Sequence, residues 1–187
     1  MPSARGLFWL VFAATLGVYI VMLLWTLPAI TAAAGGLAPF DLRPAGYSFD
    51  EARAFLAALT PEGTALYRGV QQRLDIAYPA LLAATLVMAI LMLAPAGLGR
   101  WRWLLAATAL PGMVFDYLEN TVVARMLDGG AAGLTPGLAA EASRWTLLKS
   151  AFSALAFTVL LVLLALWLFR RVSHPRRGAF PAPERKD

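Results

Sequence analysis

The stretch Pro111-Gly-Met-Val-Phe-Asp-Tyr-Leu-Glu-Asn-Thr-Val-Val-Ala-Arg125 places two carboxylates and an amide inside the third of four apolar segments. Asp116, Glu119 and Asn120 are spaced at i, i+3 and i+4, so they share one face of a helix. Ionisable residues within a hydrophobic span are rare, and they face the interior of a bundle or a wet cavity. The stretch therefore predicts a membrane helix with a polar site on its inward face.

The composition extends this prediction to the whole chain. The 187 residues are 60% hydrophobic and 14% charged, whereas a soluble domain is about half apolar and about a quarter charged. Several apolar runs reach the roughly 20 residues that a spanning helix needs. We expect an all-α integral membrane protein, with a single transmembrane domain over residues 1–172 and a basic, disordered tail over 173–187.

Four spans are predicted, and together they form a four-helix bundle. The first run is much longer than the roughly 7–15 apolar residues of a secretory signal, so we expect it to be retained as a helix. Pro79 cannot donate to the carbonyl of Asp75, and it predicts a kink in the second span. Pro111-Gly112 predicts a bend in the third span. The spans lie at about 7–30, 76–94, 101–123 and 145–169.

The loop between the first two spans, residues 31–75, contains two helix starts. Ser48 and Glu51 form a capping box, and Thr60-Pro61-Glu62 supplies an N-cap, a proline and an acid for the second start. The first of these helices carries an apolar stripe at Phe49, Ala52, Phe55, Leu56 and Leu59. The stripe fits an amphipathic helix on the membrane surface, and it fits equally a helix packed on the ends of the spans.

Basic residues predict the orientation, because they mark the cytoplasmic side. The N-terminus, the turn at Arg100 and Arg102, and the segment from Arg170 to Asp187 hold nine Lys and Arg together, whereas the 31–75 loop holds four. Both termini are therefore expected in the cytoplasm, in a bacterial plasma (inner) membrane, with the 31–75 loop outside.

The depth of the charged residues predicts one cluster in the outer half of the bundle. A helix rises about 1.5 Å per residue, so Asp116 lies roughly 24 Å and Glu119 roughly 28 Å above Arg100. Lys149 lies about one turn below the outer end of the fourth span. The candidate site residues at this level are Asp75, Tyr78, Asp116, Tyr117, Glu119, Asn120, Arg125 and Lys149.

Several roles fit this cluster. It would hold the headgroup of a small amphipathic or lipid-like ligand, or dock the chain as an accessory subunit of a larger membrane complex. As ion pairs alone, the charges would fix the register of the bundle. The enzymatic alternative uses Asp116 and Glu119 as an acid/base pair acting on a lipid, and a proton carrier would use them as relays. No nucleophile or phosphate-loop motif favours a reaction, so we favour a non-enzymatic role.

The remaining composition narrows cofactors and partners. The chain has no cysteine and a single histidine, His174, so we expect neither a metal site nor another cofactor. We attribute its positive charge to the orientation of the chain in the membrane, and we expect no nucleic-acid partner. The expected partners are the lipid bilayer, a lipid-like small molecule, and either another membrane protein or further copies of this chain.

Overall fold

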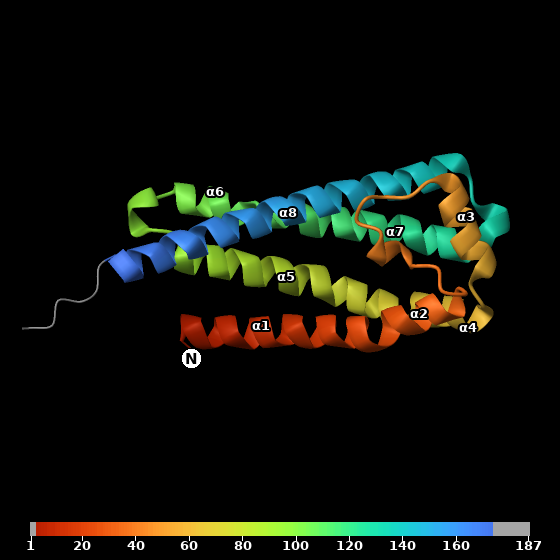
Figure 1. Ribbon diagram of the computed structural model, residues 1–187, viewed down its shortest axis with the longest axis horizontal. Coiled ribbons are helices and arrows are strands. Elements are labelled where there is room, and N and C mark those ends of the chain that lie inside the picture. Colours follow the sequence, from red (N-terminus) through yellow and green to blue (C-terminus); the bar gives the residue numbers. More distant parts are fainter. Residues whose placement is uncertain (1–2, 174–187) are drawn as a thin grey trace, which may run out of the picture.

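The structure is a computed structural model that describes residues 3–173. All regular structure in this range is helical, with no β-strand, which confirms the predicted all-α class. Most of the chain lies in four long rods that run side by side (Figure 1). Three rods are long and apolar enough to cross a membrane, namely Ala4–Ala33, Pro61–Leu93 and Pro136–Ser173.

Each rod is built from one to three helical pieces. The first and second rods each contain one π-helical segment, where the backbone bulges within an otherwise regular helix. The first rod consists of α1 (Ala4–Val21), the π-helix Met22–Thr26 and α2 (Leu27–Ala33), and the second of α4 (Pro61–Leu66), the π-helix Tyr67–Gln71 and α5 (Gln72–Leu93). The third consists of α6 (Trp101–Ala107) and α7 (Ala109–Gly133), and the fourth is α8 (Pro136–Ser173).

The rods extend beyond the predicted spans, most of all at the end that carries the first loop. α8 begins at Pro136, nine residues before the expected start of the fourth span at 145. The predicted tail, 173–187, lies outside the described residues except for Ser173, which ends α8.

The interruption of the third rod lies at Thr108, between α6 and α7. Pro111 has no amide hydrogen, so the carbonyl four residues earlier, at Ala107, loses its helical partner. The sequence predicts the bend at Pro111-Gly112. The observed break at Thr108 lies about one turn before it.

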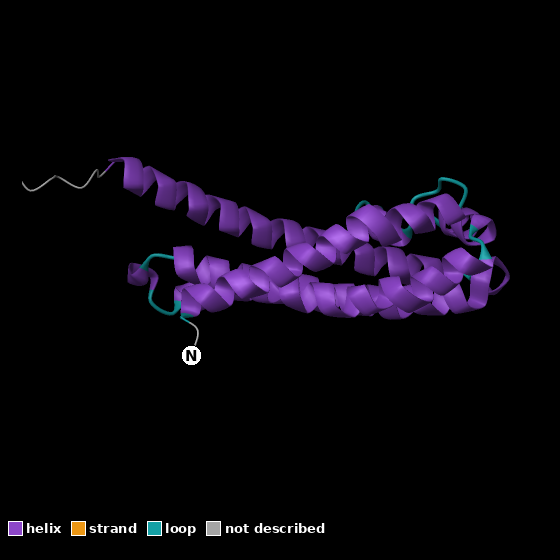
Figure 2. Ribbon diagram, turned by 90° about the horizontal axis from the view of Figure 1, so that it is seen from below, coloured by secondary structure: helices purple, strands orange, loops and turns teal. Residues whose placement is uncertain are grey.

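Three of the rods form the core of the bundle. α7 and α8 pack along each other, and α5 packs on both of them. α1 lies against α5 at the edge of this group (Figure 1). Thr15 of α1 and Thr85 of α5 join the two helices by a buried hydroxyl pair 2.8 Å apart. Toward its C-terminus α8 diverges from the other helices (Figure 2), and its side chains there, such as Leu161 and Phe169, are exposed.

The first loop folds back over one end of the rods. α3 (Phe49–Ala58) packs on α7 and α8, and its side chains Ala52, Phe55 and Leu56 are buried. The apolar stripe of α3 therefore packs on the ends of the rods, which decides between the two hypotheses for this helix.

Both predicted helix starts in this loop are confirmed. The Ser48 side chain accepts a hydrogen bond from the Glu51 amide, and the Glu51 carboxylate accepts one from the Ser48 amide at 2.7 Å. This bond to the Ser48 backbone is the main reason why the pKa of Glu51 lies below its usual value. Thr60 caps α4 by accepting from the Gly63 amide.

Four aromatic rings hold the loop in place. Phe40, in the short 3-10 helix Phe40–Leu42, is fully buried. Its ring centroid lies 4.9 Å from those of Tyr47 and Phe55 and 6.5 Å from that of Tyr67. Gly46 has a φ of 77°, and a Cβ there would lie 2.6 Å from the Ser143 hydroxyl of α8. The loop thus approaches α8 at a point where only glycine fits.

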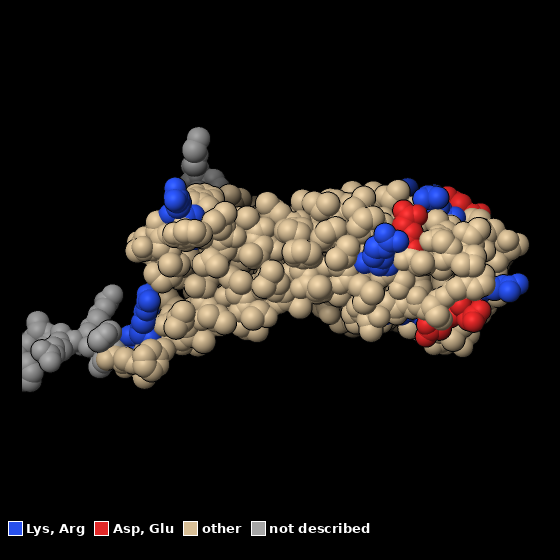
Figure 3. All heavy atoms as spheres, turned by 90° about the horizontal axis from the view of Figure 1, so that it is seen from above, with Lys and Arg blue, Asp and Glu red and all other residues tan. Residues whose placement is uncertain are grey.

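Charged side chains gather at the two ends of the rods. On the face seen in Figure 3, a broad band without acidic or basic side chains separates the ends. Basic and acidic residues occur together near the end covered by the first loop, and only basic residues are visible at the other.

Candidate functional site

A buried ion cluster joins α7 to α8. Lys149 contacts both predicted carboxylates: its ammonium pairs with Oε2 of Glu119 and lies 3.7 Å from Oδ1 of Asp116. Glu119 is 1% exposed, and its other oxygen accepts a hydrogen bond from the hydroxyl of Thr146. The structure therefore brings Asp116, Glu119 and Lys149 together, as the predicted depths indicate.

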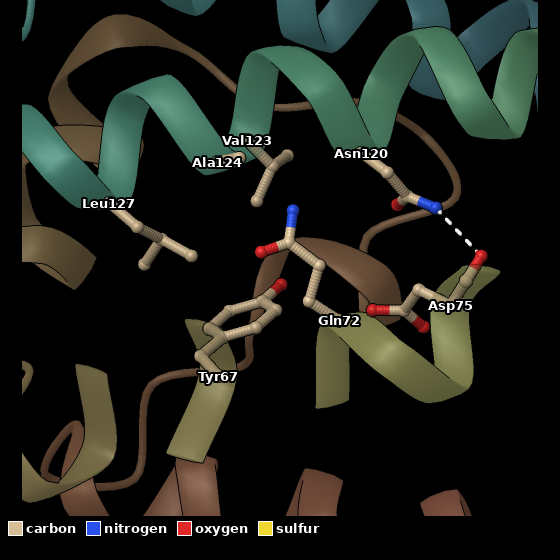
Figure 4. Close-up of a pocket in the computed structure, with 7 residues that line it drawn as sticks. All are labelled: Tyr67, Gln72, Asp75, Asn120, Val123, Ala124 and Leu127. Atoms are coloured by element: carbon tan, nitrogen blue, oxygen red, sulfur yellow. Dashed lines mark hydrogen bonds between the residues drawn. The ribbon is translucent and has the colours of Figure 1, made fainter. Parts of the chain in front are cut away.

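Asn120 connects the same face of α7 to the turn of α5 that precedes Pro79. Its side-chain amide donates to Oδ1 of Asp116 at 3.3 Å and to the backbone carbonyl of Asp75 at 3.1 Å (Figure 4). That carbonyl is the one that Pro79 deprives of its helical partner. The Tyr117 hydroxyl donates to the next carbonyl, Ile76, at 2.9 Å. Side chains of α7 thus bind backbone carbonyls of α5 in the turn before Pro79.

The polar contacts continue from α5 to the first rod. The carboxylate of Asp75 accepts a hydrogen bond from Gln71 at 2.9 Å, and Gln71 in turn is bonded to the hydroxyl of Thr26. Thr26 and Gln71 are both fully buried, and each is the last residue of a π-helical segment. Such bulges are frequent at functional sites. Here the two bulges bring two polar side chains together between the rods.

A cleft of about 330 Å³ lies beside the ion cluster, between α5 and α8. Asp116 and Lys149 are among its polar lining residues, so the cluster forms part of its wall. The other polar lining residues are Asp41, Tyr78, Thr146, Ser150 and Ser153, and the apolar ones are Pro44, Leu82 and Phe157. Among the described residues, Glu119 does not line the cleft, because it lies behind Lys149.

Asp41 is the charged residue of this lining that the sequence analysis does not identify. It lies in the first loop, and its carboxylate accepts a hydrogen bond from the Tyr67 hydroxyl at 2.5 Å. The signal in the sequence is the stretch Phe40-Asp41-Leu42-Arg43-Pro44, which is typical of a specific turn but carries no recognisable chemistry. Only the folding of the loop over the rods brings Asp41 to the cleft.

Tyr47, in the first loop, is buried near the ion cluster. Its backbone amide donates to the Ser143 hydroxyl at 2.9 Å, and its side chain is 8% exposed. Burial raises the pKa of Tyr47 above its usual range, and the negative charge of Glu119 adds to this increase. Tyr47 is therefore a neutral phenol near this carboxylate.

The other predicted site residues lie in different surroundings. Tyr78 lines the cleft, and its ring stacks on that of Tyr19 of α1 at 5.9 Å. Asp75 faces a cavity of only about 10 Å³ between α5 and α7 (Figure 4). Arg125 lies 3.8 Å from Glu141 at the surface, away from the ion cluster. The structure thus places Tyr78, Asp116 and Lys149 in the cleft, with Glu119 buried behind them. The other four predicted residues lie elsewhere: Asp75, Tyr117 and Asn120 meet where α7 contacts α5 near Pro79, and Arg125 lies at the surface.

A second charge pair that the sequence does not predict lies nearby. Arg68 contacts Asp128 at 2.7 Å and ties the second rod to the end of α7, in a partly exposed setting.

Comparison of the chain with protein-family models, with curated proteins and with solved structures gave no match.

Proposed function

We propose that this chain is a four-span membrane protein that binds a small amphipathic or lipid-like ligand in the cleft between α5 and α8. The observation that carries this proposal is the cleft itself. A volume of about 330 Å³ lies between apolar side chains, Leu82 and Phe157, and a polar group of Asp116 and Lys149. Binding sites for small molecules have this composition, with apolar walls and a few polar groups that orient the ligand.

The membrane setting rests on the length and hydropathy of the helices. Three rods qualify as spans by both measures, and we assign the fourth span to α6 and α7. Both termini are placed in the cytoplasm, in a bacterial plasma membrane, from the excess of basic residues on that side. The first loop then covers the outer end of the bundle, and the cleft lies in the outer half, within reach of lipid.

The exposure of the lining residues supports entry from the side of the bundle. Phe157 is 42% exposed on α8, while the side chains of Asp116 and Lys149 are only 18% and 17% exposed. An acyl chain that contacts Phe157 and Leu82 would thus remain near lipid while its polar end reaches the charges. The arrangement fits a molecule with one polar and one apolar end.

The enzymatic alternative receives less support from this geometry. An acid/base pair requires that both carboxylates reach the bound molecule. Asp116 lines the cleft, whereas Glu119 lies behind Lys149 and is bonded to Thr146. We therefore favour binding over catalysis. Docking as an accessory subunit would use the exposed faces of α1 and α8 and does not require the cleft.

A cleft-filling substitution tests the proposal. Ser150 lines the cleft, whereas its neighbour Ala151 is exposed and does not line it. The Ser150→Phe variant should lose the lipid or amphiphile that co-purifies with the natural chain, and Ala151→Phe should retain it. The measurement is native mass spectrometry of protein released from nanodiscs. Retention of the same molecules by both variants would contradict ligand binding in the cleft.

A further inference from the structure

The charges at the cleft are not balanced. Its lining holds two carboxylates, Asp41 and Asp116, and one ammonium, Lys149. Glu119, directly behind the lining, adds a third carboxylate that contacts the same ammonium. With all groups ionised, the four side chains sum to a charge of −2. A ligand group placed among them meets an excess of negative charge.

The ammonium of Lys149 is already paired with carboxylates of the protein itself. It contacts Glu119 and lies near Asp116, and a carboxylate as buried as Glu119 requires a charged partner. An anionic headgroup would compete for this ammonium with Glu119, and it would also lie next to two further carboxylates. Placing like charges side by side is unfavourable for binding, so the cleft disfavours phosphate, sulfate and carboxylate groups.

Acceptor atoms remain for a donating ligand. The hydrogen bond and the ion pair of Asp116 both use Oδ1, which leaves Oδ2. Tyr67 donates to Oδ2 of Asp41, which leaves Oδ1 of that residue. The hydroxyls of Ser150 and Ser153 line the same space. A protonated primary amine has three donors and no acceptor, and its bonds to carboxylates are among the stronger hydrogen bonds in proteins.

We infer that the ligand of the cleft is an amphiphile with a protonated amine head, which binds Asp116 and Asp41 while its apolar chain lies along Leu82 and Phe157. This inference rests on the proposed function and specifies its ligand class. The amine replaces the missing positive charge, and the apolar side chains direct the rest of the molecule toward the lipid.

The test compares probes that share a chain and differ in the head. The full chain is placed in phosphatidylcholine nanodiscs and titrated with dodecylammonium, dodecanol or dodecyl phosphate, and with ethylammonium as a chainless amine. Bound probe is counted by native mass spectrometry. Ser150→Phe, in which the cleft is filled, gives the background from partitioning into the bilayer. We expect dodecylammonium to bind about tenfold more tightly than each of the other probes, as one additional charge-assisted bond allows.

A matched pair of substitutions assigns the preference to the cleft. Asp116→Asn should remove most of the advantage of dodecylammonium over dodecanol. Glu141→Gln removes the same charge at the surface beside Arg125, and it should leave that advantage unchanged. An equal effect of both variants would mean that the general charge of the protein attracts the amine, and it would overturn the inference.

The two proposals fail in different ways. Suppose that dodecyl phosphate or dodecanol bound more tightly than dodecylammonium, and above the Ser150→Phe background. This result would overturn the inferred amine head and leave the proposal of amphiphile binding intact. Equal binding of ethylammonium and dodecylammonium would overturn the apolar half of the ligand. Binding of every probe at the Ser150→Phe background would overturn the proposed function and the inference with it.

Discussion

At the scale of single residues, the site depends on the pairing of Lys149 with Glu119. Glu119 is almost completely buried, and the ammonium of Lys149 and the hydroxyl of Thr146 contact its two oxygens. Asp116 is the weaker partner, because it lies 3.7 Å from the ammonium and is more exposed. The energetic consequence is asymmetric, since loss of one member leaves the other as an unpaired buried charge.

The first prediction is that Lys149→Met destabilises the protein and that adding Glu119→Gln restores part of the loss. Breaking a buried pair by removing one partner typically costs about 3–5 kcal/mol. The coupling between the two positions should exceed about 1 kcal/mol in a double-mutant cycle. The free energy of unfolding in mild detergent measures it.

The same cycle with Asp116→Asn is the internal comparison. Its coupling to Lys149→Met should be smaller than that of Glu119→Gln, in keeping with the longer contact. Additive effects for both acids would show that Lys149 is solvated at the outer surface and that no single cluster exists.

At the scale of secondary structure, the turn of α5 before Pro79 and the polar face of α7 are complementary. Pro79 frees the carbonyl of Asp75, and Asn120 donates to it. The spacing that aligns Asn120 with Asp116 also places Tyr117 beside Ile76. The polar face of α7 therefore has two roles, since it forms part of the cleft and it satisfies the backbone of α5.

The second prediction concerns this hydrogen bond. Asn120→Ala should destabilise the protein by about 1–3 kcal/mol, because it leaves a buried carbonyl without a donor. In a Pro79→Ala background the helix supplies its own amide, so Asn120→Ala should cost clearly less. Thermal unfolding of the two single variants and the double variant measures the difference. An equal cost in both backgrounds would show that Asn120 acts mainly through Asp116.

The third prediction concerns α3. Phe55 is fully buried between Phe40 and Tyr67, and large-to-small changes at such positions cost about 3–5 kcal/mol. Phe55→Asp should cost at least as much, and it should expose the first loop to protease. Ala54→Asp places the same charge on the exposed side of α3 and is the control. If both variants resist protease equally, the loop is held by contacts other than this aromatic group.

At the scale of the whole molecule, the rods form an asymmetric bundle. α5, α7 and α8 pack together, α1 is added at the edge of α5, and α8 leaves the bundle toward its C-terminus. The first loop covers the end near the ion cluster. The start of α6, with Arg100 and Arg102, and the last turn of α8, with Arg170 and Arg171, lie at the opposite end (Figure 1). This polarity of the molecule matches the proposed orientation in the membrane.

The fourth prediction tests that orientation. Cysteines introduced at Ala45 and Ser173 are exposed, and the chain has no other cysteine. A membrane-impermeant thiol reagent should label Ala45→Cys in intact cells and Ser173→Cys only after permeabilisation. Ala45 is preferable to Ser48, whose hydroxyl caps α3. Labelling of both positions from the same side would contradict the four-span topology.

The sequence by itself determined the all-helical class, the caps at Ser48 and Thr60, and the shared face of Asp116, Glu119 and Asn120. These features follow from helical periodicity, apolar content and capping chemistry, which act over a few residues. The tertiary structure alone decided that Asp41 lines the cleft, that Lys149 pairs chiefly with Glu119, and that Arg125 turns away to Glu141. Each of these depends on the rotation of one helix against another or on a loop folding back over the rods. Such arrangements are set by the packing of side chains distant in sequence, so no local pattern records them.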